Sequence, residues 1–210
     1  LDSGNTKYLG DRTITNSGTI NWNAGSVDHR GNGGVVNNGL FDIKGDLSWG
    51  VEDNTYWYAQ FFQNNTGGTL RKSAGTGTAA LGWDPYWDRF VNLTNNGLVD
   101  IQAGTLQFWG NTTTTNNGEF RLADNNTSLR LIGGTLNLAG SSILSGSGAI
   151  DLGPTLTTAG TISPGGAGSI GTLTINGNLN LLPGSILQMD LAGSGIVPGL
   201  FDKLIVSGTA

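Results

Sequence analysis

The sequence predicts an all-β protein with the architecture of a right-handed parallel β-helix. Three observations lead to this prediction: a short phrase that recurs along the chain, apolar and polar residues that alternate over three to five positions, and a high glycine content of 36 in 210 residues. A period of about twenty residues, with one turn and one set of strands per copy, is typical of a solenoid. We expect roughly eight to ten stacked coils of about twenty residues each.

The recurring phrase consists of two small polar residues, a glycine and an alternating apolar stretch. Its copies begin at residues 16, 37, 95 and 116, so the first two and the last two are each separated by 21 residues. Asparagine and glycine tolerate the backbone conformations of tight corners. Stacked coils would place these residues in columns, where side-chain amides can bond along the stack. The predicted corner residues are Asn16, Gly18, Asn37, Asn38, Gly39, Asn95, Asn96, Gly97, Asn116, Asn117 and Gly118.

Short strands account for the stretches between the corners, and helical periodicity is hard to find. Alternation with one apolar and one polar face predicts half-buried strands. Parallel crossovers of this kind are normally right-handed. The clearest strand predictions are residues 69–71, 105–108, 128–131, 135–138, 172–175, 178–181 and 186–189.

Two aromatic-rich stretches interrupt the pattern, at about residues 49–62 and 82–90, and hold most of the tryptophans and tyrosines. We interpret both as loops inserted between strands on the same flank of the rod. From residue 135 onward aromatic residues are absent until Phe201. We therefore divide the chain into coils with aromatic insertions (1–134) and plainer coils (135–210), within one continuous solenoid.

Composition limits the classes of partner. The net charge is −5 and the ten basic residues are scattered, which argues against nucleic acid, because its binding needs clustered lysine and arginine. Cysteine is absent, which excludes disulfides and thiolate metal sites. No stretch approaches the roughly 20 apolar residues of a membrane helix, so we expect no membrane insertion by this segment. Both ends fall within repeat-like sequence, and we expect a segment of a longer polypeptide.

The C-terminal third resembles a known family. Its motifs are GTISPGG at 160–166, SIGTLTINGNL at 169–179, GSILQMDL at 184–191 and FDKLIVSGTA at 201–210. They closely resemble the passenger-associated transport repeat of autotransporters, over about residues 160–210. Residues 68–75 and 95–97 are similar to repeats of very large bacterial surface proteins, from which the aromatic insertions depart. The resemblance implies an exported β-helix that serves as stalk, adhesin or passenger, at the bacterial cell surface or outside the cell, without catalytic residues.

The aromatic insertions are the best functional signal in the sequence. Flat aromatic faces stack on sugar rings, and tyrosine and tryptophan are favoured in protein interfaces. The alternative is that the loops fold over and cover one hydrophobic flank of the rod. The candidate contact residues are Tyr56, Trp57, Tyr58, Trp83, Tyr86 and Trp87.

Four acids in the same insertions, Glu52, Asp53, Asp84 and Asp88, would lie together if the insertions stack. They could then hold calcium or act as the carboxylate pair of a glycosidase. Solvation of the loops and capping of turns are the simpler uses of these acids. Calcium is therefore the one cofactor that we consider.

Two further features are given a structural interpretation. The single histidine, His29, follows Asp28, but the chain lacks a nucleophile on a sharp turn, so we expect an exposed, structural histidine. Ice-binding solenoids need flat threonine rows that run across coils. The run at residues 112–115 lies within one strand or loop, and the insertions would spoil flatness, so the sequence does not favour ice binding.

Together these features favour a structural and adhesive segment of an exported bacterial surface protein, and not an enzyme. It would be a stiff rod that displays aromatic contact loops, and its exposed coil edges could stack onto a second copy to form a homo-oligomer or filament. The expected partners are host or self surface glycans or proteins. The alternative is a carbohydrate-binding or polysaccharide-cleaving β-helix module that uses the aromatic loops and the nearby carboxylates.

Overall fold

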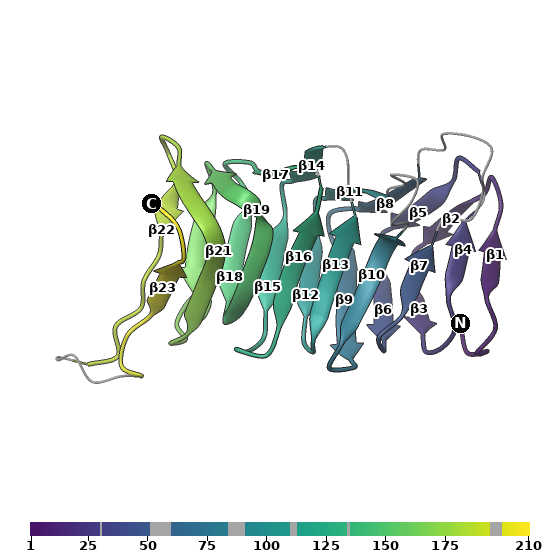
Figure 1. Cartoon of the computed structure of the whole chain (residues 1–210), viewed down its shortest axis with the longest axis horizontal. Coiled ribbons are helices and arrows are strands. Elements are labelled where there is room, and N and C mark those ends of the chain that lie inside the picture. Colours follow the sequence, from purple (N-terminus) through teal and green to yellow (C-terminus); the bar gives the residue numbers. More distant parts are fainter. Residues whose placement is uncertain (30, 51–59, 84–90, 110–112, 134, 194–198) are drawn as a thin grey trace.

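The structure is a computed structural model that describes residues 1–29, 31–50, 60–83, 91–109, 113–133, 135–193 and 199–210. These residues contain no helix and form 23 strands that pair in parallel from one coil to the next. Figure 1 shows the strands stacked along a rod whose long axis lies horizontally. The predicted all-β fold with stacked parallel strands, a parallel β-helix, is confirmed.

Each coil contributes one strand to each of three faces. The first face consists of β1 (Lys7–Leu9), β4 (Val27–His29), β7 (Ser48–Gly50), β10 (Thr78–Trp83), β13 (Thr105–Trp109), β16 (Ser128–Ile132), the first parts of β19 (Gly148–Thr158) and β21 (Thr172–Leu181), and β23 (Lys203–Val206). The second face consists of β2 (Thr13–Asn16), β5 (Gly34–Asn37), β8 (Gln60–Asn64), β11 (Val91–Asn95), β14 (Thr113–Asn116), β17 (Thr135–Leu138) and the second parts of β19 and β21.

The third face is a separate sheet of eight strands, which gives eight coils within the described residues. This number lies in the predicted range. Its strands are β3 (Thr19–Trp22), β6 (Leu40–Lys44), β9 (Thr69–Ala74), β12 (Leu98–Ile101), β15 (Glu119–Leu122), β18 (Ile143–Gly146), β20 (Thr161–Pro164) and β22 (Ile186–Leu187).

The first and second faces are joined through β19 and β21, which run from one face to the other. The register between these two strands shifts between Asp151 and Thr155. Gly153 lies in the shifted stretch with a φ of 87°, a left-handed conformation that glycine adopts without steric cost. The bend therefore replaces a separate turn in the last coils.

The core fills the space between the three faces. Strands alternate as the sequence predicts: in β11, Val91 and Leu93 are buried and Thr94 is half-buried. In the first coils the core is aromatic, with Phe41 and Phe62 edge to face at 5.3 Å between ring centroids. Further along it is mainly leucine and isoleucine. Each such side chain contributes about 1.5–3 kcal/mol by leaving water.

The boundaries predicted for the insertions are too wide. Trp49 lies in β7 and Phe62 in β8, where both are almost completely buried and their rings are 6.4 Å apart. Residues 82 and 83 belong to β10. The reason is that aromatic side chains suit a buried core strand as well as a loop. The first insertion is thus reduced to residues 51–59 between strands, and the second to residues 84–90.

Strand pairing continues across residue 134, from β14 to β17 and from β16 to β19. The two parts of the chain predicted from composition thus share the same sheets. A search of the described residues for a helix long and apolar enough to cross a lipid bilayer found none.

Candidate functional site

The predicted corner asparagines form a buried ladder between the second and third faces. The Nδ2 atom of each donates to the Oδ1 atom of the asparagine one coil further on. The distances are 2.7 Å from Asn16 to Asn37, 2.9 Å from Asn37 to Asn64, 2.8 Å from Asn64 to Asn95 and 2.6 Å from Asn95 to Asn116. Because every amide both donates and accepts, the ladder couples five successive coils.

The same amides hold the next strand of the third face in place. Asn16 donates to the carbonyl of Leu40 at 2.9 Å, and Asn64 donates to the carbonyl of Leu98 at 3.0 Å. The ladder ends where Leu138 pairs with Asn116, since a leucine offers no hydrogen bond. Beyond this point the corner relies on backbone hydrogen bonds and on Thr158, whose Oγ1 accepts from the backbone nitrogen of Gly160.

Asn64 is a member of the ladder that the corner pattern does not predict. Its turn runs from Asn64 to Gly68 and is longer by two residues than the Asn-x-Gly corners. The signal that could have found it is the Asn64-Asn65 doublet at the end of an apolar run. Two further hydrogen bonds join the outer asparagines of neighbouring corners. Asn65 donates to Asn38 at 2.7 Å, and Asn117 donates to Asn96 at 2.8 Å.

The corner glycines lie against the backbone of the preceding coil. A Cβ atom on Gly39 would come within 2.2 Å of the carbonyl oxygen of Gly18. A Cβ atom on Gly118 would come within 2.1 Å of the carbonyl oxygen of Gly97. Only glycine fits such an approach. The corner residues therefore serve close stacking of the coils.

Most of the predicted contact residues lie outside the described residues: Tyr56, Trp57, Tyr58, Tyr86 and Trp87, together with the acids Glu52, Asp53, Asp84 and Asp88. Trp83 is the last residue of β10 and pairs with Gly50 at the end of β7. On the other side of the insertions, Gln60 pairs with Val91. Each insertion thus connects a strand of the first face to a strand of the second face, and the two belong to adjacent coils.

No group of three or more histidine, cysteine or acidic residues within the described ranges is arranged to hold a metal ion. The four acids of the calcium prediction are not among those ranges.

His29, at the end of β4, is fully buried, so the predicted exposure is wrong. The side chain turns inward against Trp49, at 5.9 Å between ring centroids. Its Nε2 donates to the carbonyl of Gly10 at 2.9 Å, because a carbonyl can only accept. Burial lowers the pKa of His29 and outweighs the opposing effects of the Gly10 carbonyl, Asp11 and Asp28.

Among the residues that the structure describes, three buried polar atoms around this histidine find no hydrogen-bond partner: Nδ1 of His29, Nε1 of Trp49 and Oε1 of Gln60. Gln60 uses its Nε2 to donate to the backbone carbonyl of His29 at 2.8 Å. Each unsatisfied group costs about 1–3 kcal/mol. Within the described residues, His29 is therefore a buried core side chain whose polar surroundings are incompletely paired.

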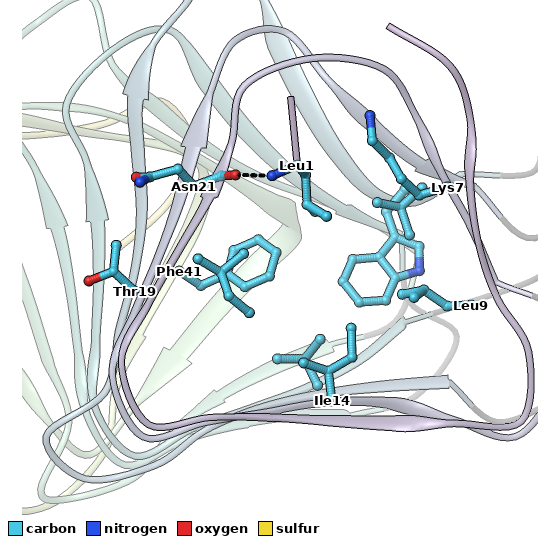
Figure 2. Close-up of a pocket in the computed structure, with 11 residues that line it drawn as sticks. Leu1, Lys7, Leu9, Ile14, Thr19, Asn21 and Phe41 are labelled. Carbon is cyan, nitrogen blue, oxygen red and sulfur yellow. Dashed lines mark hydrogen bonds between the residues drawn. The ribbon is translucent and has the colours of Figure 1, made fainter. Parts of the chain in front are cut away.

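A cavity of about 240 Å³ opens at the end of the first coil (Figure 2). Leu1 lies at its edge and donates its ammonium hydrogen to the carbonyl of Asn21 at 2.7 Å. Leu9, Ile14 and Phe41 point into the cavity. Leu9 and Ile14 lie on β1 and β2, at the end of the stack of described strands, whereas Phe41 lies one coil further in on β6, which pairs with β3. The lining is mainly apolar and suits packing.

The third face carries a column of ion pairs. Asp42, Arg71, Asp100 and Arg121 follow one another in register, and Asp42 and Arg71 are 2.7 Å apart. Burial acts to raise the pKa of Asp42, but hydrogen bonds from Arg71 and Ser73, together with the charges of Arg71 and Lys44, outweigh it and lower the pKa. The hydrogen bond to Asp100 raises the pKa of Arg121. This column stabilises the contact between coils.

The described residues therefore offer an asparagine ladder, a buried histidine and an ion-pair column. Comparison of the chain with protein-family models, with curated proteins and with solved structures found no match.

Proposed function

We propose that this chain is a stiff β-helical segment of an exported bacterial surface protein, with a structural and adhesive role and no catalytic activity. The observation that carries the proposal is the asparagine ladder, which links five coils from Asn16 to Asn116 above a continuous apolar core. A repeat protein whose neighbouring coils are coupled in this way resists local opening. Such a rod can hold a contact surface away from the cell.

Export is supported by the motifs that resemble the passenger-associated transport repeat. These residues form the last coils, in which β20, β21 and β23 continue the pairing of the preceding strands. The low content of charged residues, 12%, also fits a surface built from threonine, asparagine and serine.

Surface display of the chain on a bacterium that lacks it tests this proposal. We expect cells that display the chain to attach to host cells, to glycan-coated surfaces or to one another several-fold better than cells that carry the display anchor alone. The displayed chain should also outlast a denatured control during protease treatment, because its backbone is paired from coil to coil. Equal attachment, or rapid cleavage across the coils, would contradict the proposal.

A carbohydrate-binding or polysaccharide-cleaving module is the second candidate. It is favoured by the pairing of Gly50 with Trp83 and of Gln60 with Val91, which brackets two aromatic insertions on adjacent coils. Iodide quenching of variants that keep only Trp57, Trp83 or Trp87 tests it, with Trp49 as the buried reference. Free quenching of the insertion tryptophans supports a contact surface. Quenching as weak as that of Trp49 means that these rings cover the core.

A further inference from the structure

The second face carries two columns of side-chain positions that alternate with the core positions of its strands. Strand register places Thr15, Val36 and Gln63 in one column and Gly34 beside Phe61 in the other. Toward the C-terminus both columns continue through β11, β14, β17, β19 and β21. In these strands every such position whose side chain the structure describes is threonine or asparagine: Asn92, Thr94, Asn137, Thr155, Thr157, Asn178 and Asn180.

None of these positions on the second face is charged, although both other faces carry charge. The third face has the column from Asp42 to Arg121, and the first face has the pair of Arg130 and Asp151 at 3.3 Å. A rod that needed only solubility would have no reason to keep one face free of charge. The contrast points to a neutral partner for the second face.

Several of these side chains reach the surface, although Oδ1 of Asn178 already accepts from the backbone nitrogen of Thr209 at 2.8 Å. Asn137, Thr155 and Asn180 are exposed, and Thr94 and Thr157 are half-buried. Hydroxyl and amide groups both donate and accept hydrogen bonds. Parallel strands place equivalent groups about 4.8 Å apart along the rod, and alternate residues place them about 6.6 Å apart across it. The face is therefore a regular array that can bond a partner rich in hydroxyl groups.

The array adjoins an apolar platform. The half-buried ring of Phe61 lies directly over Gly34, where an added Cβ atom would come within 2.8 Å of the ring Cγ. Val36, also half-buried, lies in the neighbouring column. Aromatic faces pack against the C–H faces of sugar rings, so the platform offers a stacking site beside the hydrogen-bonding array.

We propose that the second face binds an uncharged linear polysaccharide that lies along the axis of the rod. The described threonines and asparagines of β11, β17, β19 and β21 bond its hydroxyl groups, and Phe61 stacks on a sugar ring. A water lattice such as ice is disfavoured, because Phe61 and Val36 break the regular array. This inference rests on the adhesive function proposed above, names its ligand class and assigns the ligand to side chains of the second-face strands.

Titration calorimetry of the purified chain tests the inference, with cello-, xylo- and malto-oligosaccharides from disaccharides to octasaccharides as probes. We expect at least one series to bind, with an affinity that rises with chain length because successive coils add contacts about 4.8 Å apart. The affinity should be the same at low and high salt, since no charge is involved.

A matched pair of variants locates the site. Thr157→Arg places a bulky, charged side chain in the array, and Thr174→Arg makes the same change at a half-buried threonine on the first face. Thr157→Arg should weaken binding by at least about tenfold, while Thr174→Arg should change it less than about twofold. Phe61→Ala should weaken binding in the same direction as Thr157→Arg. Circular dichroism and thermal melting confirm that each variant folds.

The inference is overturned if no oligosaccharide binds, if Thr157→Arg and Thr174→Arg weaken binding equally, or if the chain instead slows ice recrystallisation. These outcomes are distinct from failure of the adhesive function. If displaying cells attach but the purified chain binds no oligosaccharide, the adhesive function stands and the polysaccharide ligand is rejected. If the purified chain binds oligosaccharides but displaying cells do not attach, the ligand stands and the adhesive function is rejected.

Discussion

The side-chain amide of Asn64 donates to the Oδ1 of Asn95 at 2.8 Å, although 31 residues, including an aromatic insertion, separate the two in sequence. The corner of each coil is therefore held to a fixed position while the length of the coil varies. Because Asn64 also accepts from Asn37 at 2.9 Å, it is hydrogen-bonded to the coils on both sides of it.

Asn64→Ala should lower the free energy of unfolding by about 3 kcal/mol. The change leaves the Nδ2 of Asn37, the Oδ1 of Asn95 and the carbonyl of Leu98 short of a partner in a buried corner. Urea unfolding followed by tryptophan fluorescence measures the loss. The matched control is Asn65→Ala, which removes contacts at the surface and should cost less than about 1 kcal/mol. Equal losses in the two variants would show that the buried ladder contributes nothing special.

Two glycines of the same corner motif should respond differently to alanine. In Gly118→Ala the new Cβ would collide with the carbonyl of Gly97, and we expect a loss of about 1–3 kcal/mol from overpacking. Gly18 has no atom within 4 Å of its Cβ position, so Gly18→Ala should stay within about 0.5 kcal/mol of the parent. Thermal unfolding of both variants checks the difference. A tolerated Gly118→Ala would mean that coils can shift apart at this corner.

Much of the fold could be predicted because local pattern and global stacking agree. The Asn-x-Gly corners at residues 16, 37, 95 and 116 repeat with a period that only a solenoid explains, and they lie in one ladder. The bounds of the insertions could not be predicted, because an aromatic residue such as Trp49 or Phe62 suits a buried strand as well as a contact loop. Composition alone does not separate the two uses.

The polar features of the core and of the second face could not be predicted from the sequence, for a different reason. Lys72 occupies an apolar column of the third face and is completely buried, yet its Nζ donates to Asp46 at 3.2 Å and to the carbonyls of Ala74 and Gly75. A lysine can be buried at such a position only because the adjoining turns supply hydrogen-bond acceptors for its ammonium group. The array of the second face likewise needs the register between strands, because residues 112–115 look like a single local run until Thr115 pairs with Thr94.

Arg71→Gln should destabilise the chain by about 2 kcal/mol near neutral pH. The change leaves the carboxylate of Asp42, whose side chain is 1% exposed, without its charged partner. The loss is smaller than for a fully buried pair, because the side chain of Arg71 is 30% exposed. Arg130→Gln is the matched control: its side chain and that of Asp151 are 50% and 44% exposed, so the loss should stay below about 1 kcal/mol. Chemical unfolding of both variants measures the difference, and similar losses would contradict the argument.

The ion pair also predicts an acid dependence. The pKa of Asp42 is lowered in the folded chain, so the unfolded chain binds a proton more readily as the pH falls. The contribution of the pair is present above the unfolded pKa and is lost as the pH falls through the folded one. The destabilisation by Arg71→Gln should therefore shrink at acid pH. A loss of equal size at neutral and acid pH would show that packing of Arg71, and not its charge, is responsible.

His29 should make the stability of the chain depend on pH just below neutrality. Burial lowers the pKa of its imidazole from the ordinary value of 6.5, so between the unfolded and folded pKa values the unfolded chain holds more protons. The free energy of unfolding should thus be steady above about pH 7.5 and should fall as the pH is lowered through 6.5. Urea unfolding from pH 8 to pH 5.5 measures this slope. Because the chain has a single histidine, His29→Gln should remove the slope in that window. If the slope persists in the variant, it comes from another group. A flat profile in the parent would mean that His29 has the same pKa in the folded and the unfolded chain.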